Sequence, residues 1–214
     1  MLVGERARRF NSHMAKTTAE KRKPPLDVIA FESPRAFEAW LAKHHGACPG
    51  IWLKFARKAS GVPTVIYAEA LDAALCYGWI DGQVKQCAED ARYYLQRFTP
   101  RTKRSKWSKV NVGKAEALVA AGRMTPAGLR QIEAAKADGR WDVAYDSPSK
   151  ATMPEDLEAA LAKNKAAREF FGTLKGRNRY AILYRIQDAK RPETRARRVK
   201  EFVAMLARGE KVYP

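Results

Sequence analysis

Cysteine, histidine and long apolar runs are scarce in this 214-residue chain. The three cysteines, Cys48, Cys76 and Cys87, are an odd number without CxxC spacing or a nearby histidine pair, so a disulfide framework and a zinc site are both unexpected. No metal or other cofactor is expected. No stretch approaches the roughly 18 apolar residues that a membrane-spanning helix needs, and the first residues lack a secretory signal. We therefore expect a cytoplasmic protein that does not insert into membranes.

Established catalytic signatures are absent as well. The sequence contains no G-x-G-x-x-G, Walker A, G-x-S-x-G or H-E-x-x-H pattern, which removes common enzyme classes and leaves uncommon ones open. The first expectation is a binding or stress-related protein without a conventional active site. Neither the reaction nor the oligomeric state follows from the sequence.

Acidic residues are few, and the net charge of +18 is concentrated in three segments. Residues 1–25 carry seven basic and two acidic side chains, residues 97–114 carry seven basic and none acidic, and residues 175–200 carry ten basic and two acidic. Such clusters attract nucleic acid, anionic lipid or phosphorylated small molecules, although a merely basic soluble surface explains them equally well. Whether the three segments share one face decides between these interpretations.

The hydrophobic pattern predicts an α+β fold, with a small antiparallel sheet and flanking helices followed by an all-helical C-terminal subdomain. Residues 1–25 are expected to form a disordered basic tail, with either Met1 or Met14 as the true start. Residues 26–144 form the α+β domain, and residues 150–210 form the helical subdomain. We expect that subdomain to pack on the first domain, because a bundle of about sixty residues has a marginal core of its own.

The segment with the most candidate binding residues covers residues 94–111 and runs from a strand through a basic loop into a helix. Ser105 is predicted to cap the helix, which places free N–H groups beside Arg101 and Arg104. A helix N-terminus flanked by guanidinium groups suits an anion, and Trp107 is then available to stack on a ring. The expected anion ligands are Arg101, Arg104, Ser105, Trp107 and Lys109. The alternative is a basic loop whose tryptophan packs into the core.

Asp81 follows a predicted helix end and precedes a glycine, which favours a turn or salt-bridge role. A catalytic role stays open, with a pocket near Asp81, Gln96 and Arg97 that acts on a phosphorylated or anionic small molecule.

The C-terminal helix opens with Arg195, Arg197 and Arg198, which lie largely off its apolar face. Together with the preceding helix they form a helix–turn–helix-like pair. This keeps nucleic-acid binding open beside the simpler interpretation of a solvated helix face.

Three segments resemble the bacteriocin-protection, YdeI/OmpD-associated family. They are YAEALDAALCYGWIDG at residues 67–82, LQRFTPR with SKWSKVN at residues 95–111, and AKRPETR at residues 189–195. The resemblance implies a bacterial protein of largely unassigned biochemistry, linked to bacteriocin resistance and to an outer-membrane porin. It supplies no catalytic residues. Direct contact with a porin is doubtful because the sequence shows no export signal, so any role at the envelope is expected to be indirect.

Overall fold

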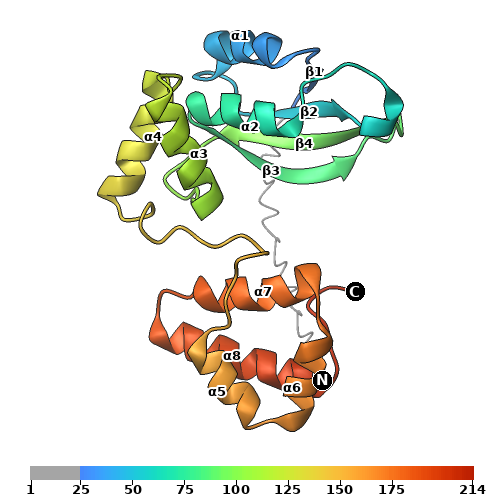
Figure 1. Cartoon of the computed structure of the whole chain (residues 1–214), viewed down its shortest axis with the longest axis vertical. Helices are drawn as coiled ribbons and strands as arrows, with labels where there is room; N and C mark the ends of the chain where they lie inside the picture. The colour runs from blue at the N-terminus through green and yellow to red at the C-terminus, as the bar shows by residue number, and fades with distance from the viewer. Residues whose placement is uncertain (1–24) are drawn as a thin grey trace, which may run out of the picture.

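The computed structural model describes residues 25–214. The expected basic tail and the choice between Met1 and Met14 therefore lie outside the described residues, except for Pro25. Within that range a four-stranded sheet with flanking helices is followed by helices alone, which confirms the α+β expectation (Figure 1).

The sheet has the strand order β1-β2-β4-β3, with β1 (Val28–Ala30), β2 (Ile51–Ala56), β3 (Trp79–Gln86) and β4 (Tyr93–Pro100). The β2–β4 and β3–β4 pairs are antiparallel as expected, and β3 and β4 form a hairpin. The β1–β2 pair is parallel, so the expected small antiparallel sheet carries one parallel strand at its edge. Helix α1 (Pro34–His44) connects these two strands and returns the chain to the same direction.

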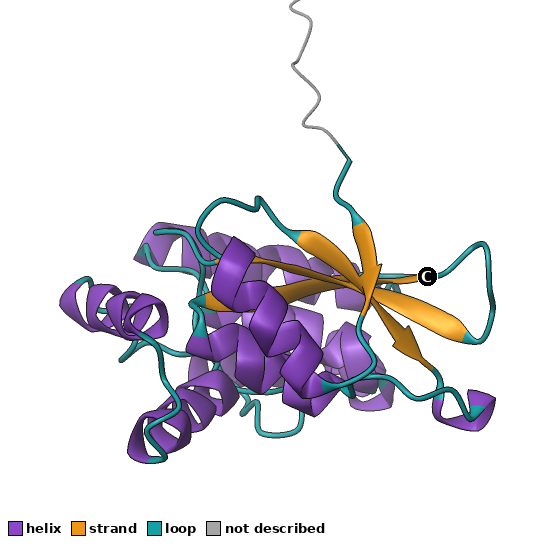
Figure 2. Ribbon diagram, turned by 90° about the horizontal axis from the view of Figure 1, so that it is seen from above, coloured by secondary structure: helices purple, strands orange, loops and turns teal. Residues whose placement is uncertain are grey.

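Helices α1 and α2 (Tyr67–Cys76) cover one face of the sheet, as Figures 1 and 2 show. The Ser33 hydroxyl caps α1 by accepting a hydrogen bond from the Ala36 N–H at 3.2 Å, with proline at the first helical position. Alternate residues of β2 and β4 point into the core between sheet and helices, where Phe37, Phe55 and Phe98 are fully buried.

Helices α3 (Lys109–Ala120) and α4 (Pro126–Ala137) extend this domain beside α2. A second buried cluster joins α2 to α3 and α4 and includes Leu75, Trp107, Leu118 and Ile132. A short 3-10 helix, η1 (Lys58–Ser60), follows β2.

The C-terminal helices are α5 (Glu155–Ala162), α6 (Lys165–Thr173), α7 (Gly176–Gln187) and α8 (Pro192–Ala207). Helices α6 and α7 are separated by Leu174 and Lys175, which adopt extended backbone between Gly172 and Gly176. Large side chains such as Phe171, Leu183 and Leu206 are buried in a cluster made by these four helices. None of the helices in residues 25–214 has the length and apolar composition needed to cross a bilayer.

The helical region meets the rest of the chain through tyrosines on α7. The Tyr180 hydroxyl donates to the backbone oxygen of Asp146 at 2.9 Å, and the Tyr145 and Tyr184 rings meet edge to face at 5.2 Å. The Lys106 ammonium lies 2.5 Å from a carboxylate oxygen of Asp188. These contacts are polar and aromatic, whereas the aliphatic side chains fill the helical cluster. The domain boundaries and the docking of the helices stay predictions.

The crossing of α4 over the end of α2 depends on Gly128. A Cβ atom there would lie 2.3 Å from the Met124 sulfur and 2.4 Å from the Cys76 carbonyl oxygen. We expect Gly128→Ala to lower the free energy of unfolding by about 2 kcal/mol or more, because the two helices must separate.

Gly113 provides the matched control. It also lies inside a helix, and a Cβ there would meet nothing within 4 Å. Gly113→Ala should raise the free energy of unfolding by about 0.5–1 kcal/mol. Urea unfolding of both variants measures the difference, and a Gly128→Ala protein as stable as wild type would refute the close crossing.

Candidate functional site

The basic loop between β4 and α3 is built differently from the sequence expectation. Ser108 caps α3, and its hydroxyl accepts from the Asn111 N–H at 3.1 Å. Ser105 instead closes a turn by accepting from the Thr102 N–H at 3.0 Å. The Lys109 N–H donates to the Tyr145 carbonyl at 2.9 Å. The prediction that Ser105 caps the helix is therefore wrong, and much of the true helix start is already hydrogen-bonded.

Arg101 is the unusual member of this loop. It is only 5% exposed, and its guanidinium lies 3.5 Å from the centroid of the Trp107 ring. Its Nη1 donates to the Lys106 backbone oxygen at 3.1 Å. Its Nε and Nη2 atoms are buried and have no hydrogen-bond partner among residues 25–214.

This arrangement leaves a cation in a low-dielectric environment without a counterion. Burial lowers the pKa of Arg101 to about 10, with smaller opposing effects from Tyr145 and Asp81. An uncompensated buried charge costs several kcal/mol, so native proteins seldom keep one without a partner. The Nε–Nη2 edge of a guanidinium has the geometry that binds a carboxylate or phosphate through two parallel hydrogen bonds. The unsatisfied edge of Arg101 therefore matches an anionic partner.

Trp107 does not offer the stacking surface that the sequence suggested. It is 2% exposed, with Arg101 on its ring and the Trp141 ring meeting it edge to face at 4.8 Å. Its indole Nε1 is also buried and without a partner among the described residues. Trp107 fixes the orientation of Arg101, and a ligand ring cannot reach its face.

A cleft of about 780 Å³ lies against this loop, between it, the segment after α4, and α7. Its lining is rich in basic and aromatic side chains and consists of Lys103, Arg104, Lys106, Trp107, Asp138, Gly139, Arg140, Val143, Tyr145, Tyr184, Gln187, Asp188 and Lys190. Basic segments 97–114 and 175–200 thus meet at one cleft although about sixty residues separate them. Arg101 is not part of this lining, but it contacts two of the lining residues, the Trp107 ring and the Lys106 backbone oxygen.

The five cations of the cleft differ in their availability. Lys106 pairs with Asp188, and Arg140 pairs with Asp138 at 2.8 Å while it donates to the Ser105 carbonyl. The remaining three, Lys103, Arg104 and Lys190, form no ion pair with any residue from 25 to 214. These three provide the free positive charge of the cleft.

Only some of the expected anion ligands therefore lie at the cleft. Arg104 and Trp107 line the cleft, whereas Arg101, Ser105 and Lys109 are not part of its lining. Lys109 pairs with Asp146 at 2.9 Å.

The three proposed catalytic residues do not lie on the same face of the sheet. Asp81 and Gln96 meet on the helix-covered face, where the Gln96 amide donates to Asp81 Oδ2 at 3.0 Å. The Tyr67 hydroxyl donates to the same oxygen at 2.9 Å. Burial and then the Asp81 charge raise the pKa of Tyr67. Arg97 follows Gln96 in β4 and therefore points to the opposite face, so it does not belong to this cluster.

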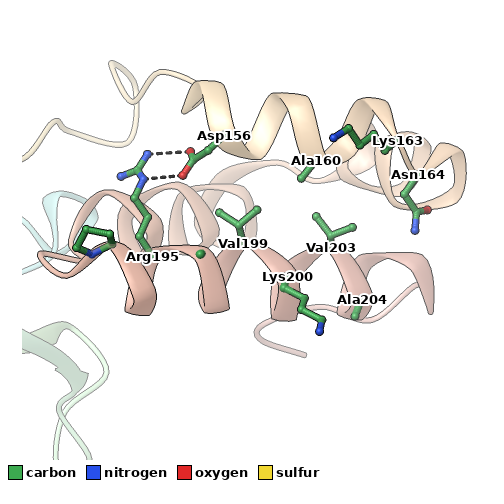
Figure 3. A pocket seen from close by; sticks show the side chains of 11 residues that line it. Asp156, Ala160, Lys163, Asn164, Arg195, Val199, Lys200, Val203 and Ala204 are labelled. Carbon is green, nitrogen blue, oxygen red and sulfur yellow. Dashed lines mark hydrogen bonds and ion pairs between the residues drawn. The ribbon is translucent and has the colours of Figure 1, made fainter.

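The arginines at the start of α8 serve largely as internal contacts. Arg195 forms a bidentate ion pair with Asp156 of α5, at 2.6 and 2.8 Å (Figure 3). Arg198 donates to the Arg185 carbonyl, and Arg197 lies 3.9 Å from Glu201. An apolar groove of about 620 Å³ runs between α5 and α8 beside the Arg195 pair.

Sequence reasoning missed Arg140, Tyr145, Tyr184 and Lys190 as neighbours of the basic loop. Lys190 lies in the basic segment 175–200, but no local pattern brings it or the other three to the loop, because they come from the segment after α4 and from α7 and its end. Among residues 25–214 no group of three or more His, Cys, Asp or Glu side chains is placed to hold a metal ion.

Fold and site together define an α+β protein with a helical C-terminal region and a basic cleft backed by a buried arginine. Residues 150–209, which contain α5 to α8, match the family described as Bacteriocin-protection, YdeI or OmpD-Associated. This match confirms the sequence resemblance for the C-terminal region, which contains the AKRPETR segment at residues 189–195. Residues 29–131 match a second description, Domain of unknown function (DUF8412), and the motifs at 67–82 and 95–111 lie there. Neither the curated proteins nor the solved structures contain a match.

The buried charge of Arg101 leads to a stability prediction. Arg101→Met keeps the length of the side chain and removes the charge, so the ligand-free variant should unfold at a temperature at least about 2 °C above wild type. Removal of any positive charge from a chain of net charge +18 also relieves repulsion. Arg130→Met, at an exposed position of α4, controls for that effect.

Thermal unfolding of the three proteins in a buffer without multivalent anions measures the comparison. A midpoint for Arg101→Met well below that of Arg130→Met would show that the guanidinium is satisfied inside the protein.

Proposed function

We propose that this protein binds a small ligand bearing a phosphate or carboxylate group in the basic cleft, and that its bacteriocin-protection-associated role acts through this binding. The observation that carries the proposal is the buried Nε–Nη2 edge of Arg101, which has no partner among the described residues. An anion at that edge would supply the missing counterion.

The cleft has the size and charge that such a ligand requires. Its volume of about 780 Å³ lies within the range typical of small-molecule sites. Lys103 and Arg104 on one side and Lys190 on the other leave it with free cations that attract an anion before any close contact forms. The anionic group then reaches the edge of Arg101 after a shift of the wall side chains.

The cleft also joins two regions of the chain, so its ligand should affect both. Lys106 from the loop and Asp188 at the end of α7 are paired across it, and the Tyr184 hydroxyl accepts from the same ammonium at 3.1 Å. A bound anion competes with Asp188 for Lys106. Binding would therefore change the contact between α7 and the loop, which is a route from ligand to the family's C-terminal helices.

An enzyme is the second candidate, and the Asp81–Tyr67–Gln96 cluster favours it. These groups hydrogen-bond together and lie near enough to Tyr145, a residue of the cleft wall, for its charge to affect the pKa of Tyr67. A cytoplasmic location and an indirect role at the envelope, without direct porin contact, remain predictions.

Binding of inorganic phosphate tests the proposed site. Phosphate should raise the unfolding temperature of wild type above that in sodium chloride of equal ionic strength. Arg104→Gln/Lys190→Gln should weaken phosphate binding about tenfold or more, because each cation supplies a charge-assisted hydrogen bond. Calorimetric titration gives the affinities.

Lys163→Gln/Lys165→Gln is the matched control, since it removes two exposed cations near the junction of α5 and α6. It should bind phosphate as wild type does. The proposal would be overturned if phosphate and chloride stabilised wild type equally. It would also be overturned if both double variants lost the same affinity for phosphate.

A further inference from the structure

The face of the sheet opposite α1 and α2 carries a second group of basic and aromatic side chains. The strand register places Trp52 opposite Arg97, Lys54 opposite Leu95, and Lys85 opposite Leu95 from the other side. Tyr93 lies on the same face, two residues along β4 from Leu95. This group, Trp52, Lys54, Lys85, Tyr93 and Arg97, is called the open-face patch below.

The rings of the patch lie within reach of its lysines. The Lys54 ammonium is 4.3 Å from the centroid of the Tyr93 ring, and the Lys85 ammonium is 4.2 Å from that of Trp52. The lysine side chains thus extend over the aromatic faces, an arrangement that is attractive but worth only about 0.5–1 kcal/mol at exposed sites. A stronger acceptor for the ammonium groups can displace them and uncover the rings.

The charge of the patch has one sign. The residues that the register places on this face include no aspartate or glutamate. Arg97 adds a third cation, and its Nε is buried without a hydrogen-bond partner among residues 25–214. Gly82 of β3 lies next to that atom, since a Cβ there would be 3.2 Å from it. Asp90 of the turn between β3 and β4 borders the patch, and hydrogen bonds from Arg92, with a smaller effect of the Lys54 charge, lower the pKa of its carboxyl. This carboxylate is already paired with Arg92 at 2.8 Å.

We propose that the open-face patch binds single-stranded nucleic acid, with bases on Trp52 and Tyr93 and phosphates on Lys54, Lys85 and Arg97. Proteins that bind single strands combine a positively charged surface with aromatic rings on which successive bases stack. The register separates Trp52 and Tyr93 by four residues along neighbouring strands, or about 13 Å, so each ring can take a different base. A duplex keeps its bases stacked inside and cannot use the rings.

The patch is distinct from the anion-binding cleft, and none of its five residues lines that cleft. The two sites can therefore be tested separately, because each has its own set of cations.

Fluorescence anisotropy with a labelled oligothymidylate of about 12 nucleotides tests the proposal on the full chain. Trp52→Leu and Tyr93→Leu keep apolar cover on the sheet and remove the rings, so each should weaken binding about tenfold. Lys54→Gln/Lys85→Gln should reduce the slope of log affinity against log salt by about 1.4, since each phosphate contact on a single strand contributes about 0.7.

Two controls separate this site from general basicity and from the cleft. Lys163→Gln/Lys165→Gln removes the same charge elsewhere, and Arg104→Gln/Lys190→Gln removes it from the cleft; both should bind the oligonucleotide with the wild-type slope. Thermal unfolding checks that each variant is folded. The proposal would be overturned if folded Trp52→Leu and Tyr93→Leu proteins kept the wild-type affinity, or if duplex bound more tightly than single strand. An equal loss of oligonucleotide affinity in the two control variants would also overturn it.

Discussion

The stacking of a buried guanidinium on an indole ring is the interaction on which the rest of this site depends. Arg101 is fixed at its backbone by an N–H donated to the Gly78 carbonyl at 2.9 Å, and at its side chain by Trp107. Gly78 ends α2 with a φ of +72°, close against α4, so the arginine is tied to the junction of the sheet and two helices. Its Nε and Nη2 atoms are thereby held inside the protein, where they have no hydrogen-bond partner among residues 25–214.

The structure shows where the basic segments of the sequence lie relative to Arg101. Two of the three basic segments border one cleft, where paired cations such as Lys106 stand beside unpaired ones such as Lys103. Because α7 supplies one wall, the cleft lies between the region that matches a domain of unknown function and the helices that match the bacteriocin-protection description. A ligand there is the simplest physical means by which the two regions can affect each other.

Local signals predicted most of the elements but little of the site. A serine followed by proline at Ser33 is typical of a helix start, and the alternation in residues 51–56 is typical of a strand; the structure contains both. Ser105 and Ser108 are both good caps, and only the tertiary bond from the Lys109 N–H to Tyr145 distinguishes them. Burial of Trp107 depends on the distant Trp141. The contact of Gln96 with Asp81 depends on strand register, which short sequence patterns do not specify.

Arginine side-chain nuclear magnetic resonance tests the central claim most directly, because a buried Nε–H exchanges slowly enough to be observed. With Arg101→Lys to assign the signal, a phosphate titration should shift the Arg101 Nε and Trp107 Nε1 resonances in a saturable manner. The same titration with chloride at equal ionic strength should leave both unmoved. If phosphate shifts only exposed arginines while Arg101 and Trp107 stay in place, the buried edge is not an anion site and the account is wrong.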